Sequence, residues 1–321
     1  MNNNNNDTKE AKWTVKEVDG IKVREVEIYT ESGKRPIEII QLSDIHFNYI
    51  NPKDKEENNE LVIASYNDPV LWLKDGASSV NLQRCLDYAK DADQIVITGD
   101  LMSYLSYGNL ELVKKYVFDP HPDVIAGLGN HDPLRSWRAT VDERDTLDER
   151  LKLIEENWIH DIYYFSKVLD DRVMLIYLDN GLKSEYAVPE SFWQCQLEPL
   201  KNDLSKAREN GYTVLLFYHI PISTGNPTNT ETYAIGSNTK PVNLYNGNLI
   251  GSHSKGVSRY IYELIVNNGD IIKAAFCGHM HADYCTEITA RGRDGKEYVI
   301  PQYVLTALPY GKGHAIKITV K

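Results

Sequence analysis

Alternation of apolar and polar residues near the start of the chain predicts a β-hairpin. Two alternating runs, residues 13–18 and 21–29, flank Asp19-Gly20, a typical sequence for a tight turn between two strands. Six later runs are short, mainly apolar and without strict alternation, which indicates strands buried on both faces. These runs are residues 37–42, 95–97, 124–128, 173–178, 214–218 and 271–276.

Apolar residues at intervals of three and four predict helices between these strands. Leu82, Cys85, Leu86 and Ala89 share one helical face, and Asn81 is expected to cap the start of that helix. Further helices are predicted over residues 110–118, about 189–210 and 257–265, with Gly211 ending the second. Strands alternate with helices over most of the chain and predominate after residue 284, so we predict a layered α/β fold with a largely buried sheet.

The domain organisation follows from length and local composition. Residues 1–12 are polar and rich in Asn, and are predicted to form a disordered tail. The remaining residues, 13–321, are interpreted as a single domain, because this length suits one large α/β domain and neither a repeat nor a linker divides it. Three segments are interpreted as loop insertions, near residues 48–79, 133–158 and 223–253.

Composition and charge limit the classes of partner. No uncharged apolar run approaches the roughly 20 residues of a membrane span, so we expect a soluble protein without a membrane partner. The net charge of −11 argues against a nucleic-acid surface, which needs a positive field. The first residues have neither a basic nor an apolar segment of a secretory signal, and the four cysteines form no C-x-x-C pair. We therefore expect a cytoplasmic protein with reduced thiols.

Residues that could bind metal ions follow the ends of the predicted strands, where binding sites form in α/β sheets. Paired residues at i and i+2 on an extended backbone would point to the same side. The set offers four imidazoles, two carboxylates and one amide oxygen, enough for two metal ions if one carboxylate bridges them. Without a thiolate, these ligands fit Mn, Fe, Zn or Ni. The set is Asp44 with His46, Asp100, Asn130, His219, and His279 with His281.

The order D-x-H, G-D, G-N-H-D, an isolated His after a strand, and G-H-x-H resembles the calcineurin-like metallophosphoesterase family over residues 44–281. This resemblance implies a four-layer α/β/β/α sandwich of two mixed sheets flanked by helices, with two metal ions at the strand ends. It also implies that Asp100 bridges the two metals and that His131 is a general acid rather than a ligand. By the same resemblance, the first metal is assigned to Asp44, His46, Asp100 and His281, and the second to Asp100, Asn130, His219 and His279.

The resemblance implies an enzyme, a metal-dependent phosphoric ester hydrolase. Its expected reaction is hydrolysis of a small phosphomonoester or phosphodiester by a metal-bridging hydroxide, with a small phosphorylated substrate as the partner. Two alternatives stay open: a non-catalytic metal-binding scaffold of the same fold, and a nuclease of the superfamily. Arg135, Arg138, Tyr233 and Tyr245 are candidates for substrate contacts, although a solvated helix face is the preferred interpretation of the two arginines. The sequence leaves the oligomeric state open.

One position departs from the family pattern. Ser103 stands three residues after Asp100, where relatives that resemble purple acid phosphatases carry a Tyr ligand. The same place holds an Asp that orients the catalytic His in the phosphoprotein phosphatases of the family. Asp132, next to His131, is therefore considered as a substitute for that Asp.

Overall fold

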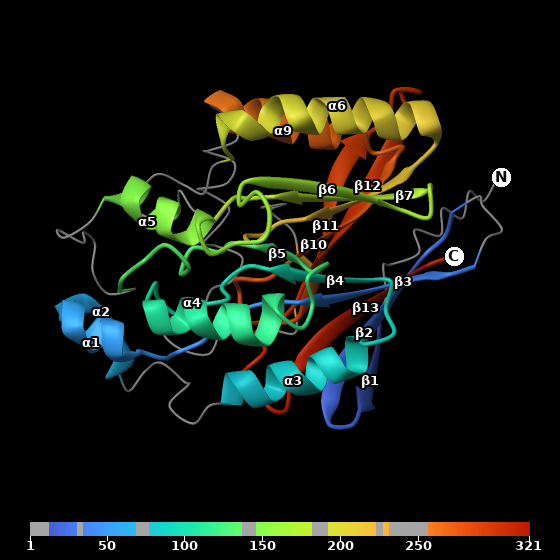
Figure 1. Ribbon diagram of the computed structural model, residues 1–321. Coiled ribbons are helices and arrows are strands. Elements are labelled where there is room, and N and C mark those ends of the chain that lie inside the picture. The colour runs from blue at the N-terminus through green and yellow to red at the C-terminus, as the bar shows by residue number, and fades with distance from the viewer. Residues whose placement is uncertain are drawn as a thin grey trace.

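Two mixed β-sheets pack face to face, and helices cover both outer faces (Figure 1). A computed structural model describes residues 13–30, 35–68, 77–136, 146–181, 192–222, 227–230 and 256–321. Figure 1 shows α6 and α9 on one side of the pair of sheets and α3 and α4 on the other. The predicted four-layer α/β/β/α sandwich is confirmed.

Among the described residues, the first sheet has six strands in the order β1-β2-β13-β3-β4-β5. The predicted hairpin at Asp19-Gly20 is present as the antiparallel pair β1 and β2. Strands β3, β4 and β5 run parallel, so their carboxyl ends meet at one edge of the sheet. The strands are β1 (Thr14–Val18), β2 (Ile21–Ile28), β3 (Ile37–Leu42), β4 (Gln94–Thr98), β5 (Ile125–Gly127) and β13 (His314–Val320).

The second sheet has seven described strands in the order β6-β7-β8-β10-β12-β11-β9. Strands β7, β8, β10 and β12 run parallel, while the other neighbours are antiparallel. Strand β6 was not predicted, because Tyr164–Leu169 shows neither strict alternation nor a continuous apolar run. The strands are β6 (Tyr164–Leu169), β7 (Val173–Leu178), β8 (Thr213–Phe217), β9 (Pro227–Thr230), β10 (Ile272–Cys277), β11 (Tyr284–Arg291) and β12 (Glu297–Val304).

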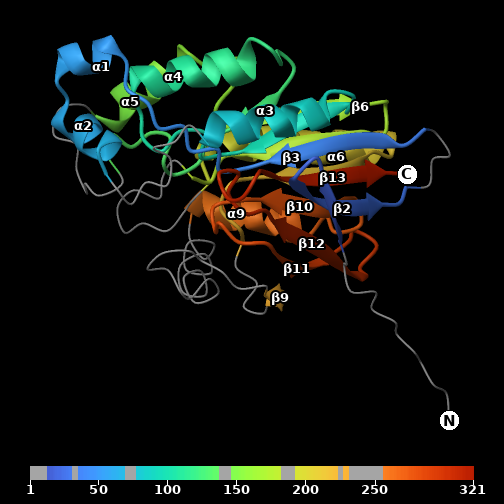
Figure 2. The same ribbon diagram turned by 90° about the horizontal axis from the view of Figure 1, so that it is seen from below.

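The predicted insertions contain regular structure where they are described. Residues 48–79 include two short helices, which lie beside α4 at one end of the molecule (Figure 2). Residues 133–158 include α5, and residues 223–253 include β9, which pairs with β11. The helical elements are α1 (Pro52–Glu57), α2 (Glu60–Tyr66), α3 (Ala77–Ala89), α4 (Tyr107–Val113), a π-helical turn (Lys114–Phe118), α5 (Leu147–Glu155), α6 (Gln194–Asn210) and α9 (Gly256–Val266).

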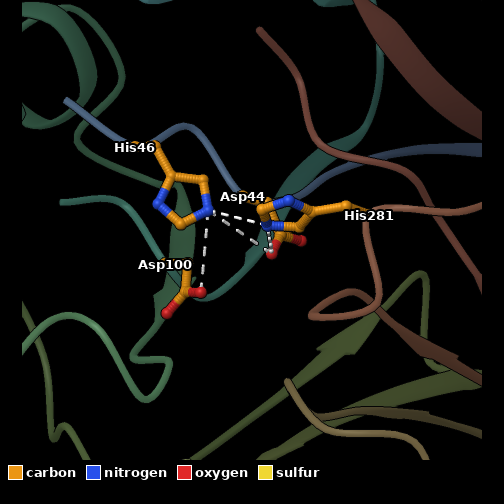
Figure 3. A group of neighbouring side chains, drawn as sticks. All are labelled: Asp44, His46, Asp100 and His281. Atoms are coloured by element: carbon orange, nitrogen blue, oxygen red, sulfur yellow. Dashed lines mark hydrogen bonds and ion pairs between the residues drawn. The ribbon is translucent and has the colours of Figure 1, made fainter. Parts of the chain in front are cut away.

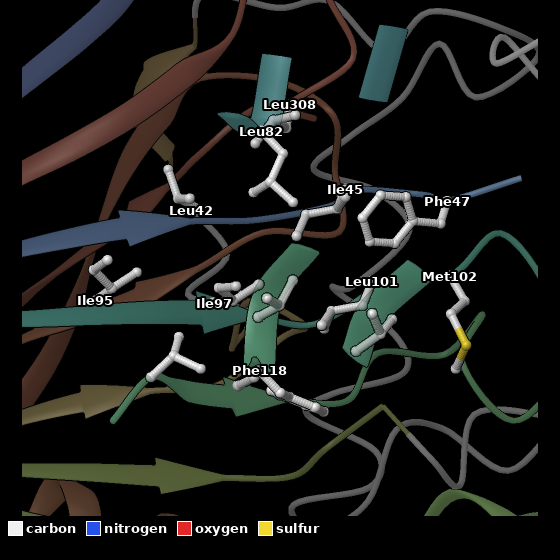
Figure 4. Close-up of a cluster of buried hydrophobic side chains, with 14 of the residues drawn as sticks. Leu42, Ile45, Phe47, Leu82, Ile95, Ile97, Leu101, Met102, Phe118 and Leu308 are labelled. Carbon is white, nitrogen blue, oxygen red and sulfur yellow. The ribbon is translucent and has the colours of Figure 1, made fainter. Parts of the chain in front are cut away.

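Side chains of each central strand alternate between two apolar cores. In β3, Ile37 and Ile39 pack between the sheets, while Ile40 and Leu42 pack against the helices. Figure 4 shows this second core, where Leu42 and Ile97 lie near Leu82 of α3. A third core packs α6 and α9 against the second sheet. Burial on both faces explains why these strands are apolar at nearly every position.

Two predictions about helix ends had different outcomes. Gly211 ends α6 with a left-handed φ of 70°, as expected. The prediction that Asn81 caps α3 is wrong, because the helix already begins at Ala77. The Asn81 amide instead donates to the carbonyls of Leu308 and Pro309, at 3.2 and 3.3 Å. A tertiary contact therefore uses the side chain that was expected to cap the helix.

No helix in the described part of the chain is long and apolar enough to cross a membrane.

A buried glutamine holds the segment that follows β8. Gln302 Oε1 accepts hydrogen bonds from Tyr218 Oη and the Ile222 N–H, at 2.5 and 2.8 Å. Its Nε2 donates to the Ile222 carbonyl and to Thr286 Oγ1, both at 2.8 Å. Because unpaired buried polar groups are costly, Gln302 contributes strongly to stability.

We expect Gln302→Leu to lower the free energy of unfolding by about 3 kcal/mol, because it leaves the N–H and carbonyl of Ile222 buried and unpaired. Urea denaturation followed by circular dichroism measures this change. Gln83→Leu is the control, since Gln83 is exposed and its side chain donates to Asp87 in the same helix. Its effect should stay within about 0.5 kcal/mol. Equal effects of the two substitutions would contradict the role of Gln302.

Candidate metal centre

The carboxyl ends of five strands, three from the first sheet and two from the second, bring the predicted ligands together. Asp44, His46, Asp100 and His281 form one group, which Figure 3 shows converging from the segments that follow β3, β4 and β10. Asp100, His219 and His279 form a second group. Within each group the potential ligand atoms lie within 4.8 Å of one another. Asp100 belongs to both groups, as a bridging ligand must.

The first group has the shape of a cation site. His46 Nε2 lies 2.8 Å from His281 Nε2 and 3.7 Å from Asp100 Oδ2. His281 Nε2 lies 3.2 Å from Asp44 Oδ1. Two imidazole nitrogens and two carboxylates therefore point at one small volume, which suits a metal ion bound through nitrogen and oxygen.

The second group is built around His219. Its Nε2 lies 3.3 Å from Asp100 Oδ2 and 3.2 Å from Asn130 Oδ1. The His279 ring stands edge-on to the His219 ring, with 5.1 Å between the centroids. Asn130 is thus placed beside the second group, as the sequence predicted.

The backbone is left-handed rather than extended at Asp100 and at both members of the two paired motifs. The values of φ are 52° at Asp44, 55° at His46, 49° at Asp100, 68° at His279 and 50° at His281. The expectation that paired residues converge because they lie i and i+2 on an extended chain is therefore wrong. They converge because the chain turns at both members of each pair, a conformation that costs about 1–3 kcal/mol per residue.

Glycines in the motifs allow the strand ends to approach the carboxylates closely. A Cβ atom on Gly278 would lie 1.8 Å from Ser43 Oγ and 2.2 Å from Asp44 Oδ2. A Cβ atom on Gly129 would lie 2.2 Å from Asp100 Oδ1. Both glycines are therefore required by space.

Three imidazoles are oriented through Nδ1. His219 Nδ1 lies 2.7 Å from the Thr98 carbonyl, and His131 Nδ1 lies 3.0 Å from the Ser103 carbonyl. Each of these two nitrogens donates to its carbonyl, which leaves Nε2 free for a metal or a substrate. His281 Nδ1 lies 3.3 Å from Tyr310 Oη. These partners could not be predicted from the sequence, because any residue has a carbonyl and Tyr310 is 29 positions from His281.

Asp132 has a different role from the one considered above. Its Oδ1 accepts the Met102 N–H at 2.8 Å and its Oδ2 accepts the Gly129 N–H at 2.7 Å. It therefore joins the loop after Asp100 to the loop before Asn130. The Ser103 carbonyl, not a carboxylate, orients the imidazole of His131.

Electrostatics in the centre favour a bound cation. Burial opposes the charge of Asp44, but the hydrogen bond from His281 and the charge of His219 outweigh burial and lower the pKa of Asp44 to about 2. Burial lowers the pKa of His46 to about 3, which keeps its Nε2 lone pair available. Burial would also lower the pKa of His219, but Asp100 outweighs it and raises this pKa to about 10. The carboxylates thus draw positive charge into the centre.

The residues considered for substrate contacts are only partly described. Arg135 is buried, and its Nη1 donates to the Leu105 carbonyl at 3.1 Å. The preferred interpretation of Arg135, as part of a solvated helix face, is wrong, because this residue is buried and non-helical. Arg138, Tyr233 and Tyr245 lie outside the described residues.

Comparisons with known proteins give one family. A family model described as calcineurin-like phosphoesterase matches residues 37–283. No curated protein matches the chain significantly.

Several solved structures resemble the chain at low sequence identity. A dimetal phosphatase from Danio rerio is 12% identical with a TM-score of 0.44, and the match covers 88% of this chain and 98% of that one. A purple acid phosphatase from yellow lupin (Lupinus luteus) is 12% identical with a TM-score of 0.43, covering 93% of this chain and 46% of that one. GAP50, described as the anchor in the inner membrane complex of Plasmodium, is 11% identical with a TM-score of 0.42, covering 86% and 73%.

We expect Gly278→Ala to lower the free energy of unfolding by about 2 kcal/mol, because the added methyl group overlaps Ser43 and Asp44. Gly211→Ala is the control, since nothing lies within 4 Å of its Cβ position and only the left-handed φ of 70° is strained. That strain costs about 1 kcal/mol. Chemical denaturation compares the two variants, and a Gly278→Ala protein as stable as wild type would refute the steric argument.

Proposed function

The chain belongs to the calcineurin-like phosphoesterase family, and from this premise we propose that it hydrolyses a small phosphomonoester or phosphodiester in a metal-dependent reaction. One observation carries the proposal: two groups of candidate ligands, buried except for His279 and His281, meet at a shared carboxylate, Asp100. Such a pair of groups suits two metal ions that act on one phosphoryl group.

The donor set fits two metal ions. Asp44, His46, Asp100 and His281 would hold the first, and Asp100 with Asn130, His219 and His279 would hold the second. Bound there, the ions would activate water as a nucleophile and neutralise charge on the phosphoryl oxygens. Nitrogen and oxygen ligands without a thiolate suit Mn, Fe, Zn or Ni.

We assign the acid role to His131. Its Nδ1–H is committed to the Ser103 carbonyl, so a proton for the leaving oxygen would come from Nε2 of the imidazolium form. Its ring centroid is 5.0 Å from that of His46, beside the first group of ligands. His131 therefore stands next to the centre and outside both ligand groups.

The side from which a substrate would approach is indicated by exposure. Asp44, His46, Asp100 and His219 are buried. The partly exposed members of the centre are Asn130, His131, His279 and His281. A phosphoryl group that enters from this side reaches the acid and both ligand groups together.

The proposal extends to the kind of substrate and to the cell compartment. The net charge of −11 supports a small phosphorylated substrate rather than a nucleic acid, because only the metal ions would supply a positive field. None of the four cysteines forms a disulfide in the described part of the chain, which supports a reducing compartment such as the cytoplasm.

We expect the purified protein to hydrolyse p-nitrophenyl phosphate or bis-p-nitrophenyl phosphate when Mn²⁺ is added, and chelation to stop turnover. His131→Ala should retain bound metal and lose about 10²–10⁴-fold in kcat, the usual contribution of a general acid. Absorbance of released nitrophenolate measures the rate, and elemental analysis measures the metal. Full metal binding with no turnover by wild type on either ester, with Mn, Fe, Zn or Ni, would favour the scaffold alternative.

The two ligand groups also predict a pattern of metal loss. Asp100→Ala should lose both equivalents of metal, because its carboxylate belongs to both groups, whereas His281→Ala should weaken only the first. His121→Ala, outside both groups, is the control and should keep two equivalents. Elemental analysis after loading with Mn²⁺ and desalting gives the counts. Equal losses in the Asp100 and His281 variants would count against a shared carboxylate.

A further inference from the structure

A chain of buried hydrogen bonds runs beneath the centre and ends on Asp44. Gln41 Nε2 in β3 lies 2.9 Å from Thr98 Oγ1 in β4. Thr98 Oγ1 lies 2.9 Å from Ser43 Oγ, and Ser43 Oγ lies 2.5 Å from Asp44 Oδ2. All four side chains are 0% exposed. Buried hydrogen-bonded networks of this kind fix side-chain orientation.

Each donor in this chain has one consistent direction. The Cys277 carbonyl in β10 lies 3.0 Å from Gln41 Nε2, and because a carbonyl only accepts, this end of the Gln41 amide must be the NH₂ group. Gln41 therefore donates to Thr98. The Asp44 carboxylate accepts, so the single proton of Ser43 is committed to Asp44 and the Thr98 hydroxyl is left to donate to Ser43.

The side chains of this hydrogen-bond chain contact Asp44, in the first ligand group, and not His219, in the second. The Thr98 hydroxyl has a second acceptor, the Leu42 carbonyl, but at a longer distance of 3.4 Å. The Thr98 main chain contacts the other ligand group, because its carbonyl accepts from His219 Nδ1 at 2.7 Å. Replacing only the hydroxyl of Thr98 would therefore disturb the contact with Asp44 and leave the contact with His219 in place.

We propose that Gln41, Thr98 and Ser43 are positioning residues, which hold the Asp44 carboxylate in the orientation that binds the first metal ion. The inference rests on the proposed function, since it assumes that the two groups of ligands bind metal. The nearest neighbours of metal ligands typically change metal affinity by 10–100-fold when they are replaced. Loss of the Thr98 hydroxyl leaves Ser43 free to rotate away from Asp44.

Thr98→Val tests the proposal, because valine has nearly the shape of threonine and lacks the hydroxyl. Calorimetric titration of the full chain with Mn²⁺ should show the first site weakened by about 10–100-fold and the second nearly unchanged. Thr98→Ser, which restores the hydroxyl, should recover the affinity. Ser43→Ala removes only the last link and should reproduce the effect of Thr98→Val, even if the latter folds poorly.

Thr286→Val is the matched control. Thr286 is also buried and its Oγ1 also accepts from a glutamine amide, that of Gln302, but it belongs to neither the centre nor the chain. It should lose stability and keep both metal sites.

The outcomes separate the two proposals. Wild-type affinity in both Thr98→Val and Ser43→Ala would overturn the positioning role while leaving the proposed function intact. The positioning role would also be overturned if Thr98→Val and Thr286→Val each weakened Mn²⁺ binding at both sites to the same extent. A general loss of structure would then explain the effect. A wild-type protein that binds no metal would instead overturn the proposed function.

Discussion

Keeping two carboxylates away from water is the constraint on which the rest of the structure depends. Asp44 and Asp100 are 0% and 1% exposed, and an unpaired buried carboxylate would be strongly unfavourable. Asp44 is compensated by the Ser43 hydroxyl and the His279 N–H, and Asp100 by the His131 N–H and the His219 imidazole. The five strand ends thus meet where negative charge must be balanced. A cation bound in the centre, as proposed, would complete that balance and would link metal affinity to stability.

The same constraint explains the strained backbone at the candidate metal centre. Left-handed values of φ occur at both members of each paired motif and at Asp100, where turns aim the side chains at one volume. Strain of this kind persists only when the surroundings over-determine the conformation. Here the strands on either side supply that support, since β3, β4 and β10 are buried almost throughout. Packing of the apolar cores therefore stabilises the strained turns that the polar centre requires.

The difference between apolar strands and polar turns also explains which features could be predicted from the sequence. The central strands could be predicted because they are apolar at nearly every position, whereas β6, which lacks such a run, could not. Asp44 and His281 could be recognised as candidate ligands from their side-chain chemistry. Main-chain contacts cannot be predicted from residue types, because any residue at position 103 would supply the carbonyl that orients His131. Asn81 was misjudged for a related reason: a local pattern predicts a cap, but a partner more than 200 residues away uses the side chain.

The contact between His131 and Ser103 has a consequence for the way the centre is assembled. A carboxylate partner would fix the imidazole through a side chain, whereas here its orientation depends on the path of the loop after Asp100. That path is in turn held by Asp132, which binds the N–H groups of Met102 and Gly129. The Asp100 carboxylate closes the circuit by accepting the His131 N–H. The position of His131, the proposed acid, is therefore set by the two loops that also carry Asp100 and Asn130, so the same contacts align it with these candidate ligands.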